Sequence, residues 1–299
     1  MIILLVILLI SGSSIAVAGR KLRHRRLRHV YRCIDHIGCY ITSPSTDTLS
    51  EMRSGLSILA FAESVAFVCK HLSGEAEERM REIVRYHSLD CHLLLLAEHS
   101  QGGRRAYPLA LLACLPLDTV LIRRIEPMLD DKDEDVRFYA LLCYFAIDEH
   151  IALHQLGRFG RRLSHYEMAE LLPKVCRQTH SVAWTPLLRS SDYNLCLLGI
   201  NIVRRFSIVE SEPDLMHVIE EGDDEVAYHA LCTLAELQCD VATPSVRRWM
   251  HAQRKEVRHI LCRHFVRSGY SLRSVTPALG KGERAIFEQM LHTYKRQIG

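Results

Sequence analysis

The sequence predicts an all-α protein in which helical hairpins stack in a row as an α-α superhelix, or solenoid, preceded by a single transmembrane helix. Three observations predict this fold class. Apolar residues recur at helical spacing, and strand-type alternation is absent. A pattern of about thirty residues repeats along most of the chain. An uncharged segment, residues 2–18, is followed at once by a basic cluster.

The composition excludes several classes of protein. Of 299 residues, 48% are hydrophobic and 24% charged, with only 15 Gly and 9 Pro, so the chain can bury a sizeable core and is neither disordered nor collagen-like. Charges are mixed with apolar residues beyond residue 19, which excludes a polytopic membrane protein. The net charge of +3 divides into seven cations at residues 20–32 and a remainder of −4. A mildly acidic body disfavours nucleic acid as a partner.

Residues 1–19 are the predicted membrane anchor. The 17 residues IILLVILLISGSSIAVA contain no charge and reach about 25 Å as a helix, slightly short of the hydrocarbon core of about 30 Å. Cations directly after the segment favour an anchor with this end in the cytoplasm. We therefore expect a single-pass membrane protein with its N-terminus outside and its solenoid in the cytoplasm. The membrane-proximal basic residues, which fix topology or also bind anionic headgroups, are Arg20, Lys21, Arg23, Arg25, Arg26, Arg28 and Arg32.

Two other interpretations of this segment stay open. Ala16-Val17-Ala18 has the form of a signal-peptide cleavage site, which would give a secreted, cleaved solenoid. The segment could also be a buried helix. No cation precedes the apolar run and seven follow it, which disfavours cleavage and export. The 11 cysteines form no framework pattern and are typical of free thiols in a reducing compartment.

The internal repeat is defined by one anchor residue per unit, at Ala106, Val136, Leu195, Val226 and Val257. The spacings are 30, 59, 31 and 31 residues. A small residue follows four positions later in most units, so positions i, i+4 and i+8 form one inward stripe that allows close helix approach. The gap of 59 implies a degenerate unit near residue 166, where Ser164 to Glu167 has the form of a capping box.

A second, shorter helix is expected ahead of each anchor, for example at residues 119–129, 213–220 and 244–251. Short acidic turns join the two helices, so each unit is a helical hairpin. We therefore divide the chain into the anchor, a basic juxtamembrane segment and linker at residues 20–49, and the solenoid at residues 50–299. A last helix, residues 284–297, should be polar on its exposed side because a terminal unit must cap the stack.

Residues 129–142, LDDKDEDVRFYALL, resemble the second half of a HEAT repeat, with an Asp-rich turn, then Val136-Arg137, then Ala140. The unit length is similar to the short HEAT-like class found in bilin-lyase-type proteins and many bacterial scaffolds. Val257-Arg258 matches the Val-Arg step, whereas Val226-Ala227 and Leu195-Cys196 depart from it. The resemblance covers roughly residues 50–299. It implies a stacked superhelix that presents surfaces to partners.

No pattern assembles an active site. Cys33, His36 and Cys39 have metal-like spacing, but zinc needs four ligands and no second cluster matches them. His150 and His154 lack the glutamate that a metalloprotease motif requires after the first histidine. Gly-rich phosphate loops, nucleophile elbows and paired CxxC motifs are also missing from the sequence. We expect no catalytic, cofactor-binding or metal-binding residues.

Five Arg-Arg pairs, at 104–105, 123–124, 161–162, 204–205 and 247–248, could line a groove for an anionic partner. HEAT-like DNA glycosylases use such surfaces together with tryptophans, and this chain has Trp184 and Trp249. The default interpretation is that these arginines are solvated or join neighbouring repeats.

The predicted function is a membrane-anchored, non-catalytic scaffold or adaptor that binds an unidentified protein partner at the cytoplasmic face. The alternative is a HEAT-like enzyme or enzyme subunit, lyase-like or DNA-glycosylase-like, acting through its concave groove. Asp, His or Trp residues converging in a groove would favour the enzyme, whereas scattered exposed apolar and charged side chains would favour the scaffold.

Overall fold

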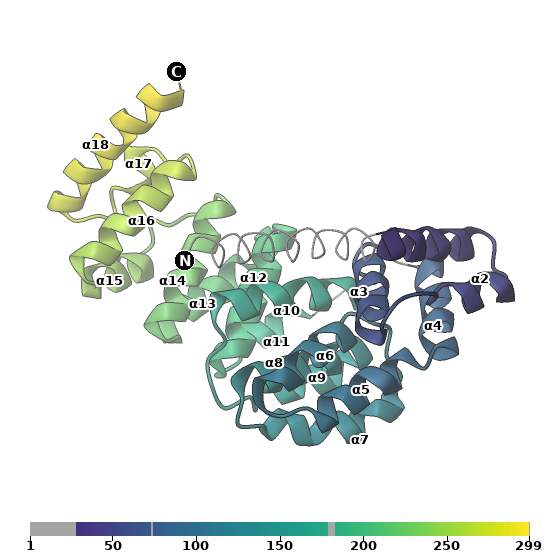
Figure 1. Cartoon of the computed structure of the whole chain (residues 1–299). Coiled ribbons are helices and arrows are strands. Elements are labelled where there is room, and N and C mark those ends of the chain that lie inside the picture. The colour runs from purple at the N-terminus through teal and green to yellow at the C-terminus, as the bar shows by residue number, and fades with distance from the viewer. Residues whose placement is uncertain (1–27, 73, 179–182, 299) are drawn as a thin grey trace, which may run out of the picture. The chain divides into compact units, whose positions relative to one another are not determined.

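The computed structural model describes residues 28–72, 74–178 and 183–298. All secondary structure in these ranges is helical, without a strand, and the predicted all-α class is confirmed (Figure 1). By its internal contacts the chain divides into two compact units, one ending at Ala152 and the other starting at Leu153.

The first unit opens with a helix over residues 28–42. Its further helices are α2 (Thr46–Glu51), α3 (Ile58–Cys69), α4 (Glu75–Tyr86), α5 (Leu89–His99), η1 (Gly102–Arg105), α6 (Ala106–Leu112), η2 (Thr119–Leu121), α7 (Ile122–Ile125), η3 (Glu126–Asp130) and α8 (Glu134–Ile147), and α9 (Glu149–Leu156) spans the boundary. The predicted juxtamembrane segment and linker, residues 20–49, includes most of α2, whose Leu49 is buried. The successive helices α5, α6 and α8 pack side by side.

The second unit is built from α10 (His165–Gln178), α11 (Trp184–Leu188), α12 (Tyr193–Phe206), η4 (Val209–Ser211), α13 (Glu212–Glu221), α14 (Asp224–Glu236), α15 (Pro244–Ala252), α16 (Lys255–Arg267), α17 (Leu272–Val275) and α18 (Lys281–Ile298). The longer helices α12, α14, α16 and α18 each pack on the next, and α11, α13 and α15 do the same beside them. The order of the helices in space therefore follows their order along the chain. This packing is compatible with a helical solenoid.

The repeat anchors occupy one common helical position. Val136, Leu195, Val226 and Val257 are each the third residue of α8, α12, α14 and α16, and Ala106 is the first residue of α6. Three of these helices have an aspartate N-cap whose carboxylate accepts backbone N–H bonds in the first turn, namely Asp133, Asp192 and Asp223. Arg254 stands at the same place before α16 and makes no such bond. The aspartate caps thus fix where α8, α12 and α14 begin.

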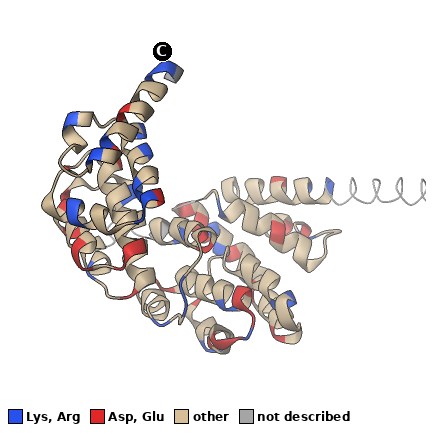
Figure 2. Ribbon diagram, turned by 90° about the vertical axis from the view of Figure 1, so that its left-hand side faces the viewer, with Lys and Arg blue, Asp and Glu red and all other residues tan. Residues whose placement is uncertain are grey.

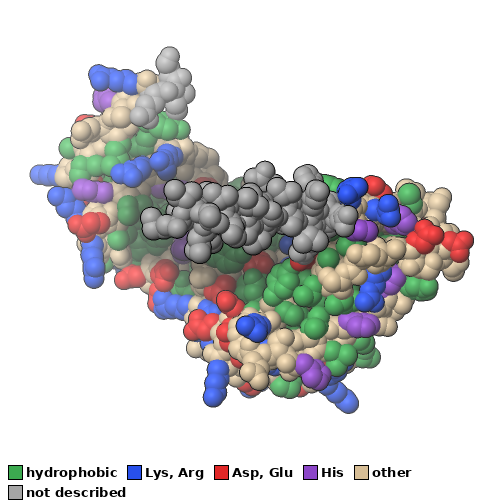
Figure 3. Space-filling view, viewed as in Figure 1, with side chains coloured by type: hydrophobic (Ala, Val, Ile, Leu, Met, Phe, Trp, Pro, Cys, Tyr) green, Lys and Arg blue, Asp and Glu red, His purple; other side chains and the backbone are tan. Residues whose placement is uncertain are grey.

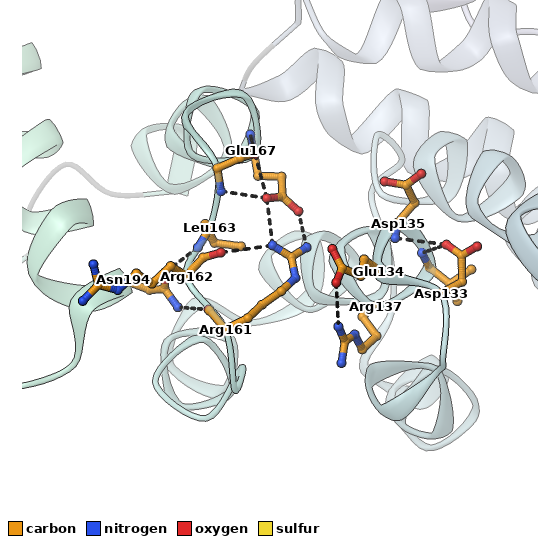
Figure 4. Close-up of polar contacts among 11 residues, drawn as sticks. Asp133, Glu134, Asp135, Arg137, Arg161, Arg162, Leu163, Glu167 and Asn194 are labelled. Carbon is orange, nitrogen blue, oxygen red and sulfur yellow. Dashed lines mark hydrogen bonds and ion pairs between the residues drawn. The ribbon is translucent and has the colours of Figure 1, made fainter.

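The degenerate unit begins at α10, and its third residue is Glu167. The predicted capping box is confirmed, because the Glu167 N–H donates to Ser164 Oγ at 3.2 Å while the Ser164 N–H donates to Glu167 Oε2 at 2.8 Å (Figure 4). Leu171 and Val175, four and eight residues on, are fully buried. In this unit a glutamate therefore occupies the position that an apolar anchor residue occupies in the others. This explains the spacing of 59 residues between the anchors Val136 and Leu195.

The chain's last described helix, α18, caps the second unit as predicted. Glu288, His292, Lys295 and Arg296 are exposed. Arg284 is half-buried, and its guanidinium donates to the Thr276 carbonyl at 3.1 Å. The exposed side of α18 is thus largely polar, as predicted.

The structure corrects the predicted transmembrane helix and the predicted single-pass localisation. Across residues 28–72, 74–178 and 183–298, no helix combines the length and the apolar character needed to cross a membrane. The apolar helix α3 has 12 residues, about 18 Å, against a hydrocarbon core of about 30 Å, and the 18-residue α18 is charged along its length. The predicted anchor, residues 1–19, lies outside the described residues, as do Arg20, Lys21, Arg23, Arg25 and Arg26. Arg28 and Arg32 are exposed on the first described helix.

Candidate functional site

At least one arginine of each Arg-Arg pair contacts an acidic side chain. Arg124 donates to both carboxylate oxygens of Glu98 at 2.9 and 2.7 Å, and Arg204 lies 3.3 Å from Glu236. The other acidic partners are Asp131 for Arg105, Glu167 for Arg161, Asp223 and Glu225 for Arg162, and Glu220 at 4.0 Å for Arg248. Most of these partners lie about one repeat away along the chain. The default interpretation of inter-repeat arginines is confirmed at these positions, and the five pairs do not form a free cationic groove.

The turn before α10 is fixed by one buried amide. Asn194, only 3% exposed, accepts a bond from the Leu163 N–H at 2.8 Å and donates from Nδ2 to the Arg161 carbonyl at 2.8 Å (Figure 4). Arg161 in turn bonds the carboxylate of Glu167. Burial raises the pKa of Glu167, but the bonds from Arg161 and Ser164 outweigh it and hold the pKa below its usual value. These polar groups satisfy one another and serve the fold.

A cavity of about 340 Å³ lies beside α12 and α14, and two of the charged groups that line it, Arg162 and Asp223, are paired with each other. Arg162 stacks over the Tyr193 ring, 4.2 Å from its centroid, and bonds Asp223 at 2.6 Å. The Glu225 N–H and then Arg162 lower the pKa of Asp223, and burial is the main cause that raises the pKa of Tyr193 to about 12. Arg189, which also lines the cavity, donates to Asp214 at 2.8 Å. The shifted pKa values here thus follow from a backbone hydrogen bond, an ion pair and burial, all of which a structural role explains.

A second cavity, of about 430 Å³, lies between α16 and α18 and has a different lining. The side chains that line it are Arg263, Val266, Arg267, Ile286, Gln289, Met290, Thr293 and Tyr294. We call it the α16–α18 groove. None of these side chains is a carboxylate, an imidazole or a thiol. Basic and hydrophobic side chains lie beside one another over these helices in Figure 3. The groove therefore combines an apolar lining with two basic side chains, a combination suited to binding a surface.

The side chains of the two arginines in this groove, Arg263 and Arg267, are exposed. Within the described residues neither side chain makes a hydrogen bond or an ion pair, so both are available to a partner. Arg258, on the same helix, is engaged instead, with Nε donating to Glu283 at 2.9 Å. Arg263 and Arg267 thus differ from Arg258 on the same helix, because their guanidinium groups stay available to a partner.

The groove lies in a basic part of the chain. Residues 253–299 contain ten basic and three acidic residues, a net charge of +7, whereas residues 33–252 contain 21 basic and 32 acidic residues, a net charge of −11. Figure 2 shows Lys and Arg gathered on the helices near the C terminus. The net charge of −4 for the chain beyond residue 32 conceals this segregation, because it averages the basic last repeats with the acidic ones before them. A separate count over the last repeats would have found it.

The candidate metal and thiol residues do not assemble. Cys33 is buried and shares a helix face with Ile37 and Tyr40, while Cys39 is exposed on another face and His36 is half-buried. In the described ranges no group of three or more His, Cys, Asp or Glu side chains could hold a metal ion. His150 and His154 are both exposed on α9.

The buried cysteines are poor nucleophiles. Burial raises the pKa of Cys33, Cys196, Cys232 and Cys262 to about 11, so these thiols stay protonated at neutral pH. Trp184 and Trp249 are half-buried and pack against the core of the second unit. Neither lines the α16–α18 groove.

Comparisons with protein-family models, with curated proteins and with solved structures find no significant match to this chain.

Proposed function

We propose that this protein is a HEAT-like helical-repeat scaffold that binds a protein partner and performs no catalysis. The repeat length of 31 residues, the anchors at the third position of the long helices and the aspartate N-caps support the HEAT-like assignment. A row of hairpins has a long surface on which side chains from several units can contact one partner.

The α16–α18 groove is the observation that carries this proposal. Its lining combines apolar side chains with two exposed arginines and lacks the Asp, His or Trp residues that would favour an enzyme. Elsewhere in the second unit, Arg162 and Asn194 are committed to contacts between repeats. A surface of this kind gains binding energy from apolar burial and direction from charge.

Site-specific photo-crosslinking tests the proposal. A photoreactive residue is placed in the full-length chain at Tyr166 of α10 or at Gln289 of α18, both exposed, with Arg247 of α15 as an exposed comparison site. In extracts of the native cells we expect one dominant protein adduct from a long-helix site. That protein, once purified, should bind the purified chain.

Two results would contradict the scaffold. One is a set of adducts that follows protein abundance and is the same at all three sites. The other is turnover of a defined small molecule by the purified chain at a rate that survives further purification.

A further inference from the structure

We infer that the α16–α18 groove binds an acidic amphipathic helix of the partner protein. The inference rests on the proposed function and names the chemistry of the partner at that site.

The apolar floor of the groove has helical periodicity. Ile286, Met290 and Tyr294 are spaced by four residues along α18 and therefore form one stripe over about two turns, roughly 12 Å. Val266 of α16 borders the stripe from the other helix. A helix laid along such a stripe contributes apolar residues at i, i+3 or i+4 and i+7, which is the usual mode of helix-in-groove recognition.

The two free arginines define the charge of the ligand. Arg263 and Arg267 are four residues apart on α16, so they share a helix face, and both line the groove. Two carboxylates one turn apart on a bound helix would face them in register. Arginine binds carboxylates through paired N–H donors, which fixes orientation as well as affinity.

The surrounding charge favours this ligand over a basic one. The net charge of +7 over residues 253–299 attracts an acidic segment and repels a basic segment. A phosphate backbone would use the cations but gain little from the aliphatic Ile286 and Met290. The polar outer side of α18 disfavours end-to-end stacking of two copies. Acidic charge with an apolar stripe is the chemistry that uses both parts of the groove.

Fluorescence anisotropy with the full-length chain tests the inference. The probe is a labelled helical peptide with Leu on one stripe and Glu elsewhere, and its counterpart carries Lys in place of Glu. We expect the Glu peptide to bind and the Lys peptide not to bind. Raising the salt from about 0.05 to 0.5 M should weaken the Glu peptide's binding because the Debye length falls from more than 10 Å to a few Å.

Variants locate the binding. Arg263→Glu with Arg267→Glu should weaken the Glu peptide at least about tenfold, since like charges then face each other. Ile286→Ser should also weaken it, because the apolar floor is interrupted. The matched control is Arg205→Glu with Arg247→Glu, which makes the same charge change at exposed arginines outside the groove and should leave the affinity within about twofold. Circular dichroism and the thermal midpoint verify that each variant is folded.

The inference would be overturned if the Glu peptide did not bind, or if both peptides bound equally well. It would also be overturned if the groove variant and its control lost the same affinity for the Glu peptide. A single-stranded oligonucleotide that binds more tightly than the Glu peptide, and whose binding is abolished in the groove variant, would overturn it as well. A dimer in sedimentation that disappears in the groove variant would assign the groove to a second copy instead and would equally overturn it. If one of these outcomes is found but crosslinking at Tyr166 still identifies a protein partner, the groove inference is wrong and the proposed function stands. If no crosslinking site yields a partner, the proposed function is wrong.

Discussion

At the scale of single residues, the second unit depends on polar side chains that are buried and satisfied. Asn194 pairs with the backbone on both sides of the turn before α10, and Glu167 pairs with Arg161 and Ser164. Buried polar groups stabilise a fold only while every partner is present, because an orphaned group keeps its desolvation penalty. Both residues are therefore sensitive points.

Asn194→Ala should destabilise the second unit by about 1–3 kcal/mol, because the Leu163 N–H and the Arg161 carbonyl lose their partner in a buried place. Denaturant unfolding followed by tryptophan fluorescence measures it, since both tryptophans, Trp184 and Trp249, belong to this unit. The control is Asn201→Ala, whose Nδ2 bonds only the Leu197 carbonyl of its own helix. Equal losses in the two variants would contradict the role given to Asn194.

Glu167 should make the second unit acid-sensitive. Its folded-state pKa lies below the unfolded value of about 4.3, so its contribution to stability is present above that pH and is lost as the pH falls through the folded pKa. Glu167→Gln should therefore lose less stability below about pH 4 than the parent chain. The thermal midpoint against pH, with the exposed Glu210→Gln as control, measures this. An unchanged acid dependence in Glu167→Gln would refute it.

At the scale of helices, the repeat is set by where each long helix begins and by how closely its partner approaches. The third-residue anchors and the acidic turns were readable in the sequence because both features recur at a fixed spacing. The unit at α10 was not readable, because Glu167 satisfies a buried position through Arg161 rather than through an apolar side chain. Gly199 illustrates the close approach between helices, because its lack of a side chain permits contact with α11.

Gly199→Ala should destabilise the second unit by about 1–3 kcal/mol even though alanine favours helix formation. The added Cβ would lie 2.9 Å from Leu187 Cβ and 3.0 Å from the backbone nitrogen of Leu188, so α11 would have to move away. Gly282→Ala in α18 is the matched control, because no atom lies within 4 Å of its added Cβ and helix propensity alone predicts a gain of up to about 1 kcal/mol. Denaturant midpoints compare the two, and a stabilising Gly199→Ala would be inconsistent with close packing there.

At the scale of the whole molecule, the sequence predicted the helical class and the repeat length but not the candidate site. The groove requires Arg263 and Ile286 to be neighbours, and only the packing of α16 against α18 shows that. The predicted transmembrane arrangement depended on the apolar residues 2–18 and the basic residues that follow them. These features carry no information about the helices that the structure describes. Charge averaged over the body concealed the basic C-terminal repeats.

The central claim is that the long helices of the second unit lie side by side in chain order. Electron–electron distance measurements test it most directly, with spin labels on introduced non-natural residues at four exposed sites: Arg205 in α12, Glu236 in α14, Arg267 in α16 and Glu288 in α18. We predict that the distance from the α12 site increases stepwise to the sites in α14, α16 and α18. A distance from α12 to α18 equal to or shorter than that from α12 to α14 would contradict the account.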